Sequence, residues 1–286
     1  MASHFTQITV LAPGLLGASL AIGARERGLA ERIHIWARRE EVRDKCALQP
    51  WCDAVFATPE EACSDSDLIV ICTPVETIHR LARRVAGGLK KGAIITDVGS
   101  TKGQVCKLSH AVMPRDVHFV GSHPMAGSEK SGMEYARGDL FSERSCFVTP
   151  LPRSDAEAVD KVRAFWQALG MDVVLSAPEQ HDEIVANISH LPHYLATIAC
   201  NWLARKDADW KKWAGPGLRD TTRVAAGSPE MWRAISEQNR DEILRAIDGF
   251  QEELDRMRES LVLGRYDELY NLFASGKSYR ESLDQR

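Results

Sequence analysis

The sequence predicts an α/β protein with an N-terminal Rossmann-type dinucleotide-binding domain at residues 1–177 and a C-terminal all-helical dimerisation domain at residues 178–286. Before Pro178, short apolar runs rich in β-branched residues alternate with helix-like spacing, which indicates a parallel sheet covered on both faces. After Pro178 only helical spacing remains. The length of 286 residues also exceeds the usual size of a single core, which favours two domains.

The first elements form a β-α-β unit. A short apolar strand is expected from Ile8 to Leu11, a helix from Leu15 to Arg27 and a second strand from Ile33 to Trp36. Open α/β sheets bind ligands beyond the carboxyl ends of their strands, so the residues that follow each strand are candidates for the site. Further strands are expected at residues 68–72, 93–96, 117–120, 146–149 and 173–175, with a helix over residues 155–169.

The second domain is expected to consist of long helices over residues 181–205, 230–263 and 266–275. The segment 210–227 between them is rich in Gly and Arg, which suits a loop that returns to the active site. Long helices expose much apolar surface for a domain of this size. We therefore expect a homodimer that forms through the helical domain.

The composition is that of an ordinary globular protein, with 44% hydrophobic and 27% charged residues. A net charge of −4 gives no basic field, so we expect a small-molecule substrate and neither nucleic acid nor a membrane as partner. The sequence shows no leader-like N-terminus and no run of roughly 18 apolar residues, which predicts a cytoplasmic protein. The seven scattered cysteines include no C-x-x-C pair, so we expect neither a disulfide framework nor a metal site.

The turn from Ala12 to Gly17 occupies the place of a G-x-G-x-x-G motif between the first strand and helix. In that motif the middle glycine lets the backbone approach a pyrophosphate, the last lets helix and strand pack closely, and the helix N-terminus attracts negative charge. Alanine replaces the first glycine, and we expect its φ to be negative, because alanine fits a turn of that kind. The expected cofactor-binding residues of this turn are Ala12, Gly14, Leu15, Leu16 and Gly17.

The residues after the second strand bear on the choice of cofactor. An NAD site normally carries an acidic residue about 20 positions after the turn, whereas this chain has Arg38 and Arg39 there. Guanidinium groups pair with phosphate, so these arginines favour NADP. Glu40 or Glu41 reaching the ribose would instead allow NAD. After the central strand, further candidates for cofactor contact are Thr73 and Pro74.

Four segments contain the residues that are best suited to catalysis or substrate binding. The loop from Gly121 to Gly132 reads G-S-H-P-M-A-G-S-E-K-S-G and gathers an imidazole, hydroxyls, an acid and an amine around flexible glycines. The others read D-V-G-S-T-K-G at 97–103, S-H-L-P-H at 189–193 and R-D-T-T-R-V-A at 219–225, with Trp232 downstream. Together they resemble motifs of the prephenate and arogenate dehydrogenase family, in the same order and over nearly the whole chain.

This resemblance implies the oxidative decarboxylation of prephenate or arogenate with NADP or NAD, giving 4-hydroxyphenylpyruvate or tyrosine. It implies that neutral His123 draws the proton from the ring hydroxyl, so activity should fall with acidification through its pKa, ordinarily about 6.5. Ser100 would orient that hydroxyl, and Arg223 would hold the ring carboxylate. The other implied substrate-binding residues are Ser128, Glu129, Ser189, His193, Arg219 and Trp232.

The choice between the two substrates stays open. An acid such as Glu129 could attract the ammonium of arogenate, whereas a positive neighbour such as Lys130 would favour the keto acid of prephenate.

Two other classes of protein fit parts of the pattern. A β-hydroxyacid dehydrogenase or imine reductase also joins a Rossmann domain to helices, but usually places a lysine where this chain has Ser189 to His193. A dinucleotide-sensing protein without catalysis is suggested by the altered turn at Ala12. Incubation with prephenate and either cofactor, followed by the absorbance of the reduced nicotinamide, discriminates among the three classes.

Overall fold

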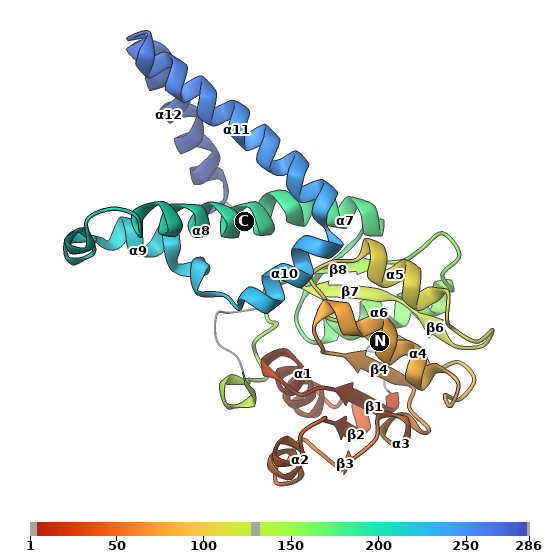
Figure 1. Ribbon diagram of the computed structural model, residues 1–286. Helices are drawn as coiled ribbons and strands as arrows, with labels where there is room; N and C mark the ends of the chain where they lie inside the picture. The colour runs from red at the N-terminus through yellow and green to blue at the C-terminus, as the bar shows by residue number, and fades with distance from the viewer. Residues whose placement is uncertain (1–4, 127–131, 285–286) are drawn as a thin grey trace. The chain divides into compact units, whose positions relative to one another are not determined.

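The computed structural model describes residues 5–126 and 132–284. Its N-terminal part is a six-stranded sheet in which all neighbouring strands run parallel, in the order β3-β2-β1-β4-β5-β6, with helices on both faces (Figure 1). The strands are β1 Phe5–Leu11, β2 Ala30–Trp36, β3 Ala54–Phe56, β4 Leu68–Ile71, β5 Ile94–Asp97 and β6 His118–Phe119. The helices between them are α1 Leu15–Glu26, α2 Glu40–Ala47, α3 Pro59–Cys63, α4 Val75–Ala86 and α5 Gly103–His110.

Burial on both faces explains why the central strand β4 is an unbroken apolar run. All four residues of β4 are fully buried, and so are Ile8 and Val10 of β1. Helix α4 turns one apolar face to the core, because Ile78, Ala82 and Val85 recur at helical spacing and are buried. The central strands predicted from the sequence are therefore confirmed. Strand β3 was not predicted, since it has only three residues, all half-buried at the sheet edge.

A second sheet of three strands follows, formed by β7 Gly121–Pro124, β8 Ser145–Thr149 and β9 Asp172–Leu175. Helix α6 Ala156–Ala168 connects β8 and β9, which pair in parallel, and a short helical turn, η1 Met133–Tyr135, precedes them. The expectation of a loop beginning at Gly121 is wrong for its first four residues. These pair antiparallel with β8, which gives their backbone groups partners and buries them.

Helices make up the rest of the described chain. The helix expected over residues 181–205 is divided by a π-turn into α7 Pro178–Val185, η2 Ala186–His190 and α8 Leu191–Leu203. The helix expected over residues 230–263 is interrupted at Asn239, between α10 Pro229–Gln238 and α11 Arg240–Val262, and α12 Tyr266–Ser282 follows. One compact unit ends at Arg240, and a second begins at Asp241 and contains most of α11 and all of α12. None of the described helices is long and apolar enough to span a membrane.

The segment 210–227 is not the loop that its glycines suggested. It folds into short helices, because Pro216 starts one of them and the hydroxyls of Thr221 and Thr222 donate to carbonyl oxygens four residues earlier. These helices are η3 Ala208–Trp213, α9 Pro216–Thr222 and η4 Arg223–Ala226. The domain boundary near residue 177 lies between β9 and α7, where strands give way to helices, and we retain it as a proposal.

Candidate functional site

The turn between β1 and α1 has the close packing of a dinucleotide-binding turn. A Cβ atom on Gly17 would lie 2.8 Å from the carbonyl oxygen of Ala12 and 3.0 Å from Cγ1 of Val10, so glycine is required there. The expected negative φ of Ala12 is wrong, because its φ is 72°. The amide of Ala12 donates to the carbonyl of Trp36 (2.9 Å), and its carbonyl accepts from the amide of Gly14 (2.9 Å). Backbone pairing thus holds Ala12 in a conformation that costs an L-residue roughly 1–2 kcal/mol.

The N-terminus of α1 suits an anionic group. Gly14 precedes the helix, and the first turn, which begins at Leu15 and Leu16, holds no acidic residue. A Cβ atom on Gly14 would meet nothing within 4 Å, so the backbone is open to approach at this position. Unpaired N–H groups and the positive end of the helix dipole favour phosphate. These residues therefore fit the pyrophosphate of a dinucleotide.

Two exposed arginines follow β2 at the same edge of the sheet. Neither Arg38 nor Arg39 forms an ion pair with another residue in the described ranges. Arg43 donates to the carbonyl oxygens of Ala37 (2.8 Å) and Arg38 (3.1 Å), which fixes the backbone of this segment. The backbone of this segment is thus fixed, while the side chains of Arg38 and Arg39 are exposed.

The segments after β4 and β5 add hydroxyl groups. Oγ1 of Thr73 is buried and finds no hydrogen-bond partner within the described part of the chain, and Pro74 next to it is the cap of α4. Ser100 follows β5 and is half-buried. Since these segments lie at the carboxyl edge of the sheet, they have the position of cofactor-contacting residues in open α/β folds.

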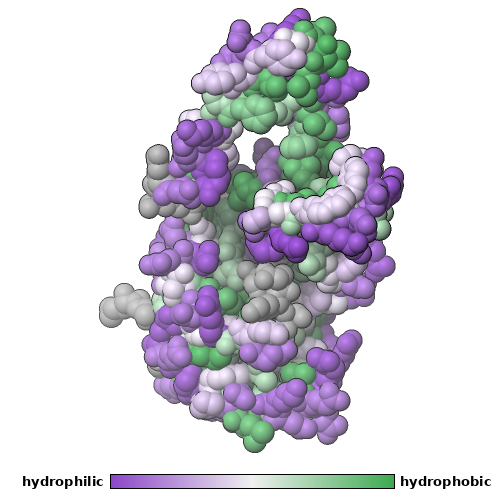
Figure 2. Space-filling view, turned by 90° about the vertical axis from the view of Figure 1, so that its left-hand side faces the viewer, coloured by the Kyte–Doolittle hydropathy of each residue, from purple (hydrophilic) through white to green (hydrophobic). Residues whose placement is uncertain are grey.

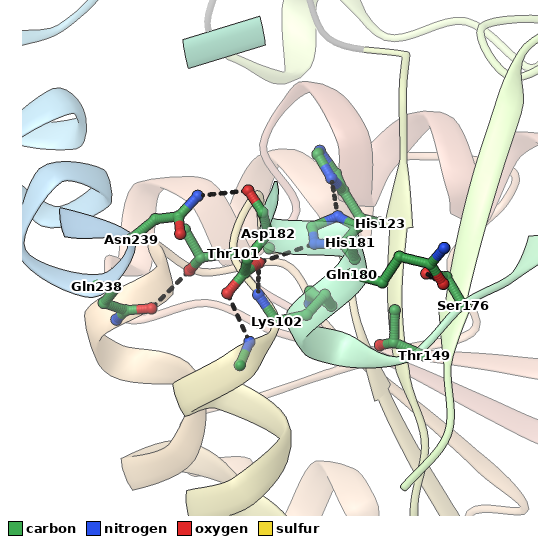
Figure 3. A network of polar contacts seen from close by, with 12 residues as sticks. Thr101, Lys102, His123, Thr149, Ser176, Gln180, His181, Asp182, Gln238 and Asn239 are labelled. Atoms are coloured by element: carbon green, nitrogen blue, oxygen red, sulfur yellow. Dashed lines mark hydrogen bonds and ion pairs between the residues drawn. The ribbon is translucent and has the colours of Figure 1, made fainter. Parts of the chain in front are cut away.

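His123 begins a chain of three side chains (Figure 3). It lies on β7 and is only 9% exposed. Its Nδ1 is 2.9 Å from Nε2 of His181 on α7, and the two rings meet edge to face. Nδ1 of His181 in turn lies 2.8 Å from Oδ1 of the neighbouring Asp182. The result is an imidazole–imidazole–carboxylate chain that reaches from β7 to α7.

The end of that chain is anchored on the start of α5. The backbone N–H of Lys102 donates to Oδ1 of Asp182 (2.7 Å), and the N–H of Gly103 donates to Oδ2 (2.8 Å). Asn239, between α10 and α11, donates from Nδ2 to the carbonyl oxygen of Asp182 (2.9 Å). Burial raises the pKa of the Asp182 carboxyl, while the two amides and the Lys102 ammonium act in the opposite direction.

Burial keeps the imidazoles of His123, His181 and His190 neutral at neutral pH. Burial lowers the pKa of His123 well below its ordinary value, and His181, Lys102 and His190 lower it further. Burial likewise lowers the pKa of His181 to about 2 and that of His190 to about 4. His123 is therefore in the neutral form that a general base requires at neutral pH.

A buried ion pair ties β5 to β7. The ammonium of Lys102 contacts Oδ2 of Asp97, both side chains are fully buried, and Lys102 also donates to the carbonyl oxygen of Ser122 (3.0 Å). Asp97 accepts from the amides of Gly99 (2.8 Å) and Ser122 (3.2 Å). Burial raises the pKa of Asp97, against the opposing influence of Lys102. The pair fixes the residue that precedes His123.

His193 and Trp232 lie together. Their ring centroids are 4.1 Å apart with a tilt of 37°, and Nδ1 of His193 contacts the carbonyl oxygen of Ser189, one turn earlier. His190, also in the S-H-L-P-H segment, is buried and packs against the edge of Trp232. The structure thus brings three of the expected substrate-binding residues into one cluster.

The two arginines of the R-D-T-T-R-V-A segment lie on short helices. Arg219 is on α9 and Arg223 starts η4, and both are exposed. Helix η4 packs against α8, which carries His193. Ser128 and Glu129 lie outside the described residues.

The parts played by His181 and Asp182 and the burial of Lys102 were not predicted from the sequence. His181 and Asp182 form a two-residue polar pair near the start of a helix, which by itself reads as solvent-facing. Lys102 was within a quoted motif, five residues after Asp97, but nothing in the sequence marks either side chain as buried. Their roles follow from contacts between segments about 80 residues apart.

The doubly wound sheet, the tight turn at the N-terminus of α1 and the buried neutral imidazole at the carboxyl edge define a Rossmann-type nicotinamide dinucleotide-dependent oxidoreductase. Residues 20–175 match the nucleotide-binding domain of prephenate dehydrogenase, and residues 177–275 match its dimerization domain. The chain belongs to the prephenate dehydrogenase family.

Individual relatives agree with this assignment. The chain is 33% identical to a prephenate dehydrogenase of Bacillus subtilis over 96% of this chain and 75% of the relative. It is 29% identical to a cyclohexadienyl dehydrogenase of Zymomonas mobilis, covering 98% and 96% of the two chains. A solved prephenate dehydrogenase from A. aeolicus, in complex with hydroxyphenyl propionate and NAD+, superposes with a TM-score of 0.92 at 29% identity and 98% coverage of both chains.

The rival oxidoreductase class shares only the fold. A 3-hydroxyisobutyrate dehydrogenase from Mycobacterium tuberculosis has a TM-score of 0.54 and 14% identity, over 79% of this chain and 72% of that one. A solved Synechocystis arogenate dehydrogenase, by contrast, has a TM-score of 0.84 and 27% identity, over 97% and 99% of the two chains.

Proposed function

We propose that this protein oxidatively decarboxylates prephenate, arogenate or both, with a nicotinamide dinucleotide as hydride acceptor. The observation that carries the proposal is the buried, neutral imidazole of His123 at the carboxyl edge of a dinucleotide-binding sheet. Such a group can accept a proton from a substrate hydroxyl where hydride transfer takes place. The relatives named as prephenate, cyclohexadienyl and arogenate dehydrogenases support this choice of substrates.

In the proposed reaction, one hydride, one proton and one carboxylate group change place at the substrate ring. The oxidised cofactor, when bound, supplies the acceptor for the hydride that leaves C4. Nε2 of His123 draws the proton of the C4 hydroxyl as this hydride departs. The bond between C1 and its carboxylate then breaks, its electron pair completes the aromatic ring, and His123 returns the proton to the phenolic oxygen. The products are a phenol, carbon dioxide and the reduced cofactor.

Other residues would position the substrate and the cofactor. We assign the orientation of the hydroxyl to Ser100 and the binding of the ring carboxylate to Arg223, through a charge-assisted pair. We assign the binding of the rest of the substrate to Ser189, His193, Trp232, Arg219, Ser128 and Glu129. The turn from Ala12 to Gly17, together with Thr73 and Pro74, would hold the cofactor.

The experiment is a spectrophotometric assay with prephenate and with arogenate, each with NAD+ and NADP+, following the reduced nicotinamide. Turnover with either substrate is expected. The His123→Asn variant should lose about 100-fold to 10,000-fold in kcat with unchanged cofactor affinity. His118→Asn, on the preceding strand, is the matched control and should keep its kcat. Absence of turnover in all four combinations would refute the proposed function.

We also propose a preference for NADP. Arg38 and Arg39 are exposed, have no acidic partner in the described ranges and follow β2, where a 2′-phosphate would lie. The double variant Arg38→Ala/Arg39→Ala should lower kcat/KM for NADP+ and leave that for NAD+ nearly unchanged. Arg32→Ala, which removes an exposed arginine within β2 itself, should change neither. A wild-type preference for NAD+ would refute this choice.

We propose that the chain forms a homodimer through its helical part and works in the cytoplasm with diffusible cofactor. Figure 2 shows apolar surface on α11 and α12, in the upper part of the view. Size-exclusion chromatography with light scattering should give twice the mass of one chain for the wild type. The double variant Tyr270→Glu/Phe273→Glu should give the mass of a single chain. A monomeric wild type would refute the dimer. The exposed apolar side chains between residues 254 and 283, in α11, α12 and the residues next to them, include Leu254, Leu261, Val262, Leu263, Tyr266, Tyr270, Phe273, Tyr279 and Leu283.

A further inference from the structure

The chain from His123 through His181 to Asp182 bears on which ring nitrogen of His123 carries a proton. Nδ1 of His123 faces Nε2 of His181 at 2.9 Å, so one of these two nitrogens must donate and the other accept. Nδ1 of His181 faces Oδ1 of Asp182 at 2.8 Å. The protonation of Asp182 therefore decides the tautomers of both rings.

Burial raises the pKa of the Asp182 carboxyl, but the hydrogen-bond donors around it favour the carboxylate form. Both of its oxygens already accept backbone N–H bonds, from Lys102 (2.7 Å) and Gly103 (2.8 Å), at the N-terminus of α5. Hydrogen bonds to the charged form, the helix dipole and the nearby Lys102 ammonium all stabilise a carboxylate. An anionic Asp182 can only accept, so Nδ1 of His181 carries a proton and Nε2 of His181 does not.

The same reasoning extends to His123. Because Nε2 of His181 lacks a proton, it accepts a hydrogen bond from Nδ1 of His123. A neutral imidazole carries one proton, which leaves Nε2 of His123 with a free lone pair. We propose that His181 and Asp182 are positioning residues that lock His123 in its Nδ1–H tautomer, so that Nε2 is the atom that takes the substrate proton. The catalytic role of Nε2 rests on the proposed function, whereas the tautomer of His123 does not depend on that function.

The packing around the two rings supports a fixed geometry. His181 is fully buried and meets the rings of His123 and Phe147 edge to face, each with 5.1 Å between centroids. Among the described residues, the charged or titratable groups that act on His123 are His181 from α7, Lys102 from the start of α5 and His190 from η2. Asp97 of β5 pairs with Lys102. When His123 takes up a proton, its Nδ1–H still donates to His181, and the Asp182 carboxylate stabilises the new charge through the chain.

The direct test is ¹⁵N NMR of the full-length wild-type protein labelled at histidine ring nitrogens, at neutral pH. The expected spectrum has a protonated Nδ1 and an unprotonated Nε2 for both His123 and His181, assigned by comparison with the His123→Asn and His181→Phe variants. A protonated Nε2 on His123 would overturn the proposal. This measurement needs no substrate, so its outcome is independent of whether prephenate or arogenate is turned over.

The kinetic test uses Asp182→Asn and His181→Phe. An amide at position 182 can donate to Nδ1 of His181, which would reverse both tautomers, while phenylalanine at 181 keeps the ring contact with Phe147 and breaks the chain. Each variant should lose about 100-fold to 10,000-fold in kcat, with KM and cofactor affinity within about twofold of wild type and a changed pH profile of kcat. Glu183→Gln, an exposed acid on the same helix, is the control and should match wild type. Should Asp182→Asn fail to fold, a wild-type kcat and pH profile in His181→Phe would overturn the proposal.

Discussion

Replacing Lys102 by methionine would leave the carboxylate of Asp97 without its cation in a fully buried site. Both side chains are 0% exposed, and Asp97 would keep only the amides of Gly99 and Ser122 as donors. Removing one partner of a buried ion pair typically costs about 3–5 kcal/mol, because the other charge stays desolvated. We expect a loss of that size in the free energy of unfolding of Lys102→Met.

The size of the effect can be checked by neutralising the remaining charge. In Asp97→Asn/Lys102→Met no charge is buried, but the single amide oxygen of asparagine can no longer accept from both N–H groups in the original geometry. One unsatisfied N–H costs about 1–3 kcal/mol, so the double variant should recover roughly 2 kcal/mol relative to Lys102→Met.

Urea unfolding measures these differences, followed by circular dichroism and by the fluorescence of the buried Trp51 and Trp166. Lys91→Met is the matched control, because its side chain is 83% exposed and 3.8 Å from Asp116, and it should shift stability by less than about 0.5 kcal/mol. If the midpoint of Lys102→Met equals that of Lys91→Met, the buried pair does not stabilise the fold as reasoned.

Four further predictions concern the site and the residues around it. Gly17→Ala should cost about 1–3 kcal/mol by overpacking against backbone, whereas Gly14→Ala should keep the unfolding midpoint but weaken cofactor binding, as measured by titration; equal stability of the two variants would contradict this. Because burial lowers the pKa of His181 to about 2 and of His190 to about 4, these rings bind more protons when unfolded. Stability should therefore fall as pH drops below about 6.5, and a midpoint independent of pH from 7 to 5 would refute it. The pH at which kcat falls on the acidic side should lie below the ordinary histidine pKa, since burial lowers the pKa of His123. Arg223→Ala should mainly raise the KM for substrate, and an unchanged KM would remove its proposed role.

Local pattern was sufficient for much of the fold. The strands β1, β2, β4 and β5 contain short apolar stretches bounded by turn residues, and for β4, which is buried at every position, the apolar sequence alone indicates two-sided burial. The turn at Gly14 and Gly17 was identified by its spacing, and close packing requires glycine at Gly17 while Gly14 leaves the backbone open to approach. Pattern failed for β7, whose residues Gly121–Pro124 have weak strand preference and are ordered by pairing with β8.

By itself the sequence determined the doubly wound architecture, the place of the dinucleotide turn and the identity of His123 as the candidate base, since each depends on residues close together in the chain. Only the tertiary structure decided the positive φ of Ala12, which the carbonyl of Trp36 helps to impose, and the partners of His123. His181 and Asp182 lie about 60 residues further along the chain, and their hydrogen bonds and depressed or raised pKa values exist only once α5, α7 and β7 pack and exclude water. Burial and long-range pairing give His123 the neutral, oriented imidazole that the proposed base requires, and neither is encoded in any single segment.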